Sequence, residues 1–229
     1  PSADVLGWDA RAKIHLLQRL CFGTIVPPNK IVCEGITRIE PVDFEYARRL
    51  DCKIKLVATT EVYEEAVRTY VFPTMVPAAS SLGATDGVLN IVTMTHATMG
   101  TYAMQGEGAG GKTTAHSVCA DVLQALHGPK RETCFGTMAG YSTQRDFYAG
   151  FCLRLTATDE VGIIRDIGNL AANANLQIEA ILQNPHTGPT VQFVVVLQPT
   201  WYQSALAFAD KINLCQWSTI RPFLTVIMK

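Results

Sequence analysis

The sequence of 229 residues lacks an excess of charge of either sign. It has 19 Lys and Arg against 20 Asp and Glu, and its formal net charge is -1. A chain without a basic field has no electrostatic footprint for nucleic acid. With 48% hydrophobic and 17% charged residues, it is also too apolar to stay disordered. We therefore expect a folded protein that does not bind nucleic acid.

Long apolar stretches are also missing. The longest, such as FVVVL at 193–197, are far shorter than the roughly 20 residues that span a bilayer, so we expect no membrane helix. The first residues, PSADVLGWDARAK, lack the basic start and apolar stretch of a signal peptide, and they lack Met. We expect that the chain is cut from a longer protein.

Paired metal-binding cysteines are absent too. No two of the seven cysteines are closer than twelve positions, so they form neither CxxC motifs nor an evident disulfide framework. The five histidines show no ligand spacing either, so we expect no metal site. Free thiols are typical of a reducing compartment, which favours the cytoplasm, with a plastid as the alternative.

Hydrophobic periodicity predicts an α+β fold in two parts. A stretch at 128–150 with four glycines, a proline and no period reads as a linker. We therefore predict a first domain at 1–128, a linker at 129–149 and a second domain at 150–229. In the first domain we predict helices at 9–21, 41–50 and 112–126 and strands at 30–36, 53–62, 65–72 (ended by Pro73 and Pro77) and 90–96, after which 101–105 leads into a glycine-rich turn. In the second we predict strands at 151–158, 176–183, 190–198 and 219–227 and helices at 162–173 and 201–214, the βαββαβ order of a ferredoxin-like sandwich.

The segment GEGAGGKTT (106–114) fits two phosphate-binding signatures, GxxxxGK[ST] and GxGxxG. A DxxG at Asp159 gives superficial support to a P-loop nucleotide hydrolase. Against it, the strand before the glycines is polar and broken by Gly100, whereas a buried parallel strand is a continuous apolar run. No NKxD motif follows. The plainest interpretation of the segment is a tight glycine turn that lets a helix pack closely.

Asp9 and Lys13 are four residues apart on the first predicted helix, so their side chains share a face. From spacing alone such a pair is usually a surface ion pair.

Several segments together carry a more specific signal. PSADVLGWDARAK (1–13) holds an Ala-Asp-Val and a Gly-x-Asp-x-x-x-Lys, and the segments CEGITRIEPVDFEYARRL, KIKLVA, SSLGATDGVLN and GEGAGGKTTAHSVCAD follow in order. Residues 1 to about 127 thereby resemble the substrate and dimerisation domain of homoserine dehydrogenases. Three features depart from the family pattern: Ser80 and Ser81 replace His-Pro, Thr113 replaces a proline, and Lys112 is an extra charge that either favours a phosphorylated cofactor or faces solvent.

The resemblance implies an enzyme that interconverts L-aspartate 4-semialdehyde and L-homoserine. It makes Lys13 the proton-transferring residue, Asp9 its hydrogen-bonded companion at the substrate, and Asp4 the residue that holds the substrate ammonium. A lysine ammonium beside an aldehyde that accepts hydride stabilises the developing oxyanion and gives it a proton. The loop residues Gly106, Gly108, Ala109 and Gly110 would lie against NADP or NAD, whose main binding part is an N-terminal Rossmann domain absent from this chain. A fragment without that domain is expected to be inactive alone.

Residues 151–229 resemble an ACT domain, an amino-acid-sensing βαββαβ module, with DEVGII at the strand-to-helix turn and NLQIEAILQ after the helix. Its place after the catalytic part matches threonine-regulated homoserine dehydrogenases. The effector carboxylate would then bind the backbone amides of Val161, Gly162 and Ile163. Asp159 would bind the effector's ammonium group, and Gln177 would contact its side chain. The resemblance implies threonine as the effector and a homodimer or higher homo-oligomer. Two alternatives stay open: the module only pairs subunits, or the whole chain is a non-catalytic sensing or assembly protein with the same fold.

Overall fold

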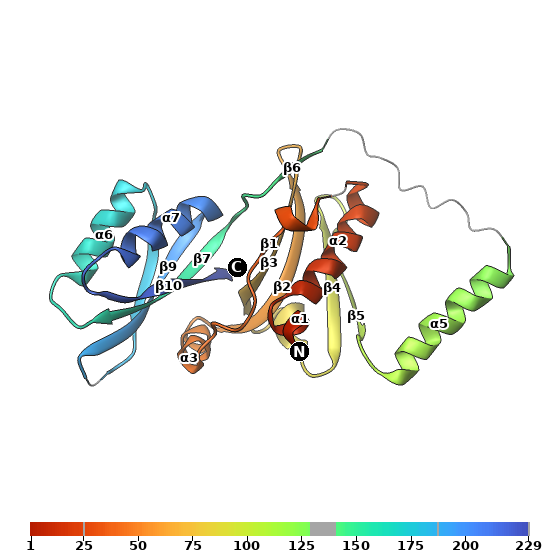
Figure 1. Ribbon diagram of the computed structural model, residues 1–229, viewed down its shortest axis with the longest axis horizontal. Coiled ribbons are helices and arrows are strands. Elements are labelled where there is room, and N and C mark those ends of the chain that lie inside the picture. Colours follow the sequence, from red (N-terminus) through yellow and green to blue (C-terminus); the bar gives the residue numbers. More distant parts are fainter. Residues whose placement is uncertain (25, 129–140, 187, 229) are drawn as a thin grey trace.

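In the computed structural model, which describes residues 1–24, 26–128, 141–186 and 188–228, the chain is a mixture of helices and strands (Figure 1), which confirms the α+β fold. None of the helices described there is long and apolar enough to cross a membrane. The first part contains α1 (Ser2–Val5), α2 (Trp8–Phe22), a 3-10 turn (Pro28–Lys30), β1 (Val32–Cys33), α3 (Pro41–Arg49), β2 (Cys52–Tyr63), β3 (Ala66–Pro77), α4 (Ser81–Ala84), β4 (Leu89–His96), β5 (Gly100–Glu107) and α5 (Gly111–Leu126).

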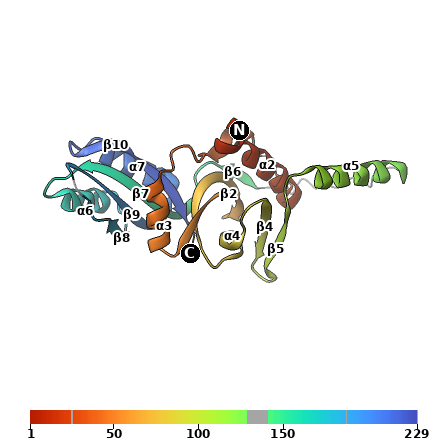
Figure 2. The same cartoon turned by 90° about the horizontal axis from the view of Figure 1, so that it is seen from below.

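The second part has the predicted βαββαβ order. It consists of β7 (Tyr148–Thr158), α6 (Ile163–Asn173), β8 (Ile178–Gln183), β9 (Thr190–Trp201), α7 (Tyr202–Asn213) and β10 (Ser218–Ile227). Its antiparallel strands lie in the order β10-β7-β9-β8, which is the ferredoxin-like order. Figure 1 shows α6 and α7 on one side of the sheet of this part and α3 on the other side, and Figure 2 views the same arrangement from the α3 side.

The sheet of the second part continues into the first. The end of β10 pairs in parallel with β3 at Thr74 and Met75, and β3 also pairs with β1, β2 and a short strand β6 (Ser142–Gln144), giving one eight-stranded sheet. The prediction that Pro73 ends the third strand is wrong. Along one edge, β3 pairs first with β1, at Tyr70 and Val71, and then with β10, at Thr74. Pro73 lies between these two ladders, so its missing N–H is tolerated.

Helix α3 covers the face of the second part's sheet that α6 and α7 leave open. Tyr46 and Ala47 of α3 are buried in one cluster with Cys152, Val194 and Val196 of β7 and β9. The Tyr46 hydroxyl donates a hydrogen bond to the Gln192 carbonyl oxygen at 2.7 Å. The two parts therefore share a core. The division at 129–149 stays a prediction, and 129–140 lie outside the described residues.

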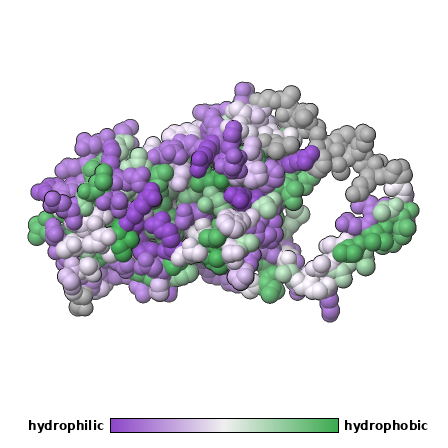
Figure 3. Space-filling model, in the orientation of Figure 1, coloured by the Kyte–Doolittle hydropathy of each residue, from purple (hydrophilic) through white to green (hydrophobic). Residues whose placement is uncertain are grey.

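The hairpin of β4 and β5 and the helix α5 extend away from this core. All residues of β5 are exposed, and α5 has no buried residue. Its apolar side chains Val118, Val122, Leu123 and Leu126 are each more than half exposed. Figure 3 shows a hydrophobic band along the projecting arm.

Candidate active site and effector loop

The start of α2, which carries the two predicted catalytic residues, is fixed by glycines. Gly7 is its N-cap residue in the left-handed region, with φ of 76°. A Cβ on Gly7 would lie 3.1 Å from Cys33 Sγ, and one on Gly35 would overlap the Val5 carbonyl oxygen and lie 2.7 Å from Leu6 Cα. The Ile36 N–H also donates to that Val5 oxygen at 2.8 Å. The chain before α2 is thus held directly against the segment after β1.

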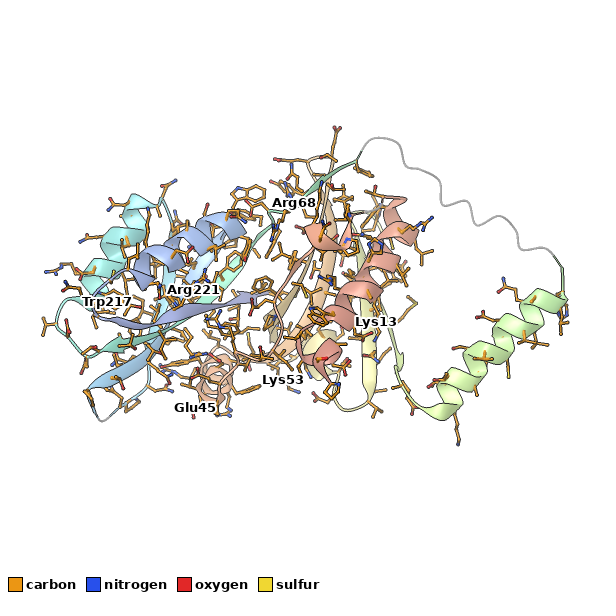
Figure 4. All side chains as sticks on the ribbon, in the orientation of Figure 1. Lys13, Glu45, Lys53, Arg68, Trp217 and Arg221 are labelled. Atoms are coloured by element: carbon orange, nitrogen blue, oxygen red, sulfur yellow. The ribbon has the colours of Figure 1, made fainter. Side chains whose placement is uncertain are left out.

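The rest of α2 is anchored on the sheet by its buried face. Ile14 packs with Val67 and Val71 of β3. Gln18, which is fully buried, accepts a hydrogen bond from Thr69 Oγ1 at 2.6 Å. These contacts leave the opposite face of the helix, with Lys13, turned to solvent, as labelled in Figure 4.

Lys13 and Asp9 meet as their spacing predicts. Lys13 Nζ lies 2.8 Å from Asp9 Oδ2, and their side chains are 62% and 45% exposed. An exposed ion pair of this kind contributes at most about 1 kcal/mol to stability, so the fold does not depend on the contact between Lys13 and Asp9. Asp4 lies in the short helix α1 directly before this segment and is also exposed. The structure therefore places all three predicted residues within one short stretch that is open to solvent.

The glycine-rich segment is a strand-to-helix turn, as predicted. Gly106 lies in β5, Gly108 and Ala109 lie in the turn, and Gly110 is the N-cap residue of α5 with φ of 127°. No atom of the described residues lies within 4 Å of a Cβ added to Gly106, so the turn is open there, whereas the Asn90 side chain fills the space beside Gly108. The preceding strand β5 pairs antiparallel with β4 and is exposed, unlike the buried parallel strand before a P-loop. This geometry argues against the nucleotide hydrolase.

The predicted effector loop lies between β7 and α6. Gly162 is the N-cap residue of α6 with φ of 105°, Val161 is fully exposed, and Ile163 begins the helix and is buried. N–H groups of a first helical turn have no intrahelical acceptor. Asp159 Oδ2 already lies 3.1 Å from His186 Nε2, and the sequence does not predict this contact. Gln177 is exposed, and its backbone carbonyl accepts from the Gln198 N–H at 2.9 Å.

A buried charged group that was not predicted from the sequence lies between the two parts. Arg154 of β7 is 6% exposed and forms ion pairs with Glu40 Oε1 at 2.6 Å and Asp43 Oδ1 at 2.8 Å. A single arginine within the apolar strand FCLRLTAT was the available signal. Glu34, which follows β1, is also half-buried; burial raises its pKa, and the charges of Arg38 and Arg221 oppose that change.

The fold and site together define a class of protein: an α+β chain with a glycine-docked helix that presents a Lys–Asp pair, joined to a ferredoxin-like module. A solved homoserine dehydrogenase from Thiobacillus denitrificans has the same fold over the whole chain, with a TM-score of 0.89 at 24% identity, and the match covers 55% of that structure.

A sequence model of the homoserine dehydrogenase family matches residues 1–123. The homoserine dehydrogenase of Neisseria gonorrhoeae is 31% identical over 210 residues, which cover 86% of this chain and 48% of that protein. That of Mycobacterium tuberculosis H37Rv is 38% identical over 130 residues, covering 55% of this chain and 30% of that protein. The chain belongs to the homoserine dehydrogenase family. It spans about half the length of the curated relatives it matches over most of its residues.

Proposed function

We propose that this chain forms the substrate-binding and proton-transferring half of a homoserine dehydrogenase, which interconverts L-aspartate 4-semialdehyde and L-homoserine in the biosynthesis of threonine, methionine and isoleucine. The observation that supports this most is the contact of Lys13 with Asp9 at 2.8 Å on a helix whose start is fixed by Gly7 and Gly35. An exposed pair on a rigid support is suited to act on a substrate rather than to stabilise the fold.

Each candidate site residue has its own role in the proposed reaction. Lys13 lies beside the aldehyde oxygen, stabilises the negative charge that develops on it, and donates a proton to it. Asp9 pairs with Lys13 at 2.8 Å and holds the lysine side chain in place. Asp4 pairs with the substrate ammonium. A nicotinamide cofactor, NADP or NAD, supplies hydride when it is bound.

The turn from Gly106 to Gly110 fits the edge of such a cofactor. The side of the turn at Gly106 is open, and the unpaired backbone N–H groups at the N-terminus of α5 would favour an anionic group of the cofactor. In this proposal the main cofactor-binding part lies in the half of the relatives that this chain does not match. The exposed apolar band of α5 supports that arrangement, because such a surface is usually covered.

The catalytic role is tested in the whole enzyme with Lys13→Ala and Lys13→Arg. Lys13→Ala should lower kcat by about 10² to 10⁴-fold, the usual contribution of a general acid. Lys13→Arg should recover little of the lost activity, because arginine does not release its proton. Lys30→Ala is the control, since Lys30 is an exposed lysine on the turn after α2. A Lys13→Ala enzyme within tenfold of the wild type would contradict the assignment.

The 229 residues alone should not oxidise homoserine, and measurable NADP-dependent turnover would overturn the proposed division of roles. It would leave the family membership intact.

We further propose that the second part is an ACT domain that binds threonine at the loop of Asp159, Val161, Gly162 and Ile163, with Gln177 at its side chain, in a homodimer or higher homo-oligomer. The open N-terminus of α6 and the carboxylate beside it support this. Threonine titrated into the chain should release heat, and Asp159→Asn should weaken binding at least tenfold. If neither heat nor a thermal shift is seen, the module only pairs subunits.

A further inference from the structure

We propose that Arg154 is a positioning residue for the candidate active site: it clamps residues 35–43, and through them the chain that leads into α2, against the strand of the effector loop. The clamp itself is argued from contacts within this chain. Its role in regulation rests on the function proposed above.

The first step is the clamp. The guanidinium of Arg154 donates to Asp43 Oδ1, to Glu40 Oε1 and, through Nη2, to the Arg38 carbonyl oxygen at 2.8 Å. Asp43 is 2% exposed, and its other oxygen accepts from the Glu40 N–H at 2.8 Å. A planar guanidinium with three acceptors in different directions fixes their relative orientation.

The second step leads from the clamp to the active site. Arg38 is two residues beyond Ile36, whose N–H donates to the Val5 carbonyl oxygen at 2.8 Å. At Gly35 the two backbones touch so closely that no Cβ fits between them. Gly7 and α2 follow at once. A displacement of residues 35–43 therefore displaces the support of Asp9 and Lys13.

The third step leads from the clamp to the effector loop. Arg154 and Thr156 are on β7, which ends at Thr158, next to Asp159. Gln192 also connects β7 to residues 35–43, because its Nε2 donates to Glu40 Oε2 at 3.1 Å and to Thr156 Oγ1 at 3.4 Å. A shift of β7 at the loop thus acts on the side chains that hold residues 35–43.

The chemistry of the clamp favours positioning over stability. Buried ion pairs are replaceable by apolar groups without loss of stability, whereas removal of one partner leaves an uncompensated charge. The test therefore changes both partners, in Arg154→Met with Asp43→Asn. Arg154→Lys is the second variant, because it keeps the charge but has a single head group that does not reach all three acceptors.

Arg49→Met is the matched control. Arg49 also crosses from α3 to the second part, where it donates to the Gln183 carbonyl oxygen at 3.1 Å and to Asn184 Oδ1 at 2.9 Å. It lies at the far end of α3 from the clamp, so its removal weakens the contact between the parts without freeing residues 35–43.

Hydrogen–deuterium exchange of this chain tests the clamp without any assay of activity. In the double variant and in Arg154→Lys, the Ile36 amide and the peptide of residues 2–9 should exchange at least tenfold faster, while β2 and β3 exchange as in the wild type. Arg49→Met should leave residues 2–9 and 36 unchanged. Unchanged exchange at residues 2–9 in both clamp variants overturns the proposal, and so does equal acceleration in Arg49→Met.

Threonine added to the same samples tests the regulatory part. In the wild type it should alter exchange both at residues 158–164 and at 2–9; in the clamp variants only the change at 158–164 should remain. If threonine alters 2–9 equally in wild type and variants, the proposed route is wrong. If it alters neither segment in the wild type, the threonine-sensing function fails, and the clamp is decided by the first measurement alone.

Discussion

Gly35 is the position near the candidate active site where the backbone has the least space. A Cβ there would overlap backbone atoms of Val5 and Leu6, which cannot move aside as a side chain does. We predict that Gly35→Ala destabilises the chain by about 3 kcal/mol or more, the upper range for overpacking. Urea unfolding measures this. Gly168→Ala, in the middle of α6, is the control. No atom of the described residues lies within 4 Å of a Cβ added there, so this change should stabilise the helix by up to about 1 kcal/mol.

The buried thiol of Cys152 makes stability depend on alkaline pH. Burial raises its pKa from 9.0 to about 12, and burial likewise raises the pKa of Tyr70 from 10.0 to about 12. Between about pH 9 and 12 the unfolded chain loses these protons while the folded chain keeps them, so stability present below pH 9 falls as pH rises. The urea midpoint should decrease over that window, and less steeply in Cys152→Ala. If the urea midpoint of Cys152→Ala falls as steeply with pH as that of the wild type, the Cys152 thiol is not the cause of the pH dependence.

At the scale of elements, the local pattern predicted most helices and strands. Helix α2 and the six elements of the second part follow their apolar periodicity, because each has one face on a core. The predicted strand at 30–36 is reduced to Val32–Cys33, since from Glu34 onward the backbone turns to contact Val5. The strand β6 lies inside the predicted linker, and it forms only because β3 offers a free edge there. Such pairing between distant segments has no local signal.

The element whose environment the sequence did not reveal is α5. The helix predicted at 112–126 exists, but no described residue covers its apolar side chains. We predict that Val122→Gln with Leu126→Gln changes the unfolding free energy of this chain by less than about 0.5 kcal/mol, as for surface positions. The same pair should lower binding of a hydrophobic dye. Phe208→Ala, in the buried face of α7, should instead cost about 3–5 kcal/mol.

At the scale of the molecule, the candidate site depends on an arrangement that no single motif contains. Asp9 and Lys13 were predictable because their spacing is local. Their support was not, because Gly35 and Arg154 act through segments far apart in the chain. The resemblance to a family named the candidate catalytic residues, but only the structure shows that residues 35–43 lie between them and the second part.

The shared core under α3 predicts that the chain unfolds as one unit rather than as the two predicted domains. Tyr46 is fully buried against β7 and β9, so Tyr46→Ala should cost about 3–5 kcal/mol. Because the lost contacts belong to both parts, hydrogen exchange of β7 and β9 in the second part and of β2 and β3 in the first, followed across a urea series, should report the same lowered midpoint. Tyr46→Phe, which removes only the hydroxyl that donates to Gln192, should cost about 1–3 kcal/mol. Two separate transitions, with only one shifted by Tyr46→Ala, would show that the parts fold independently and that α3 belongs energetically to one of them.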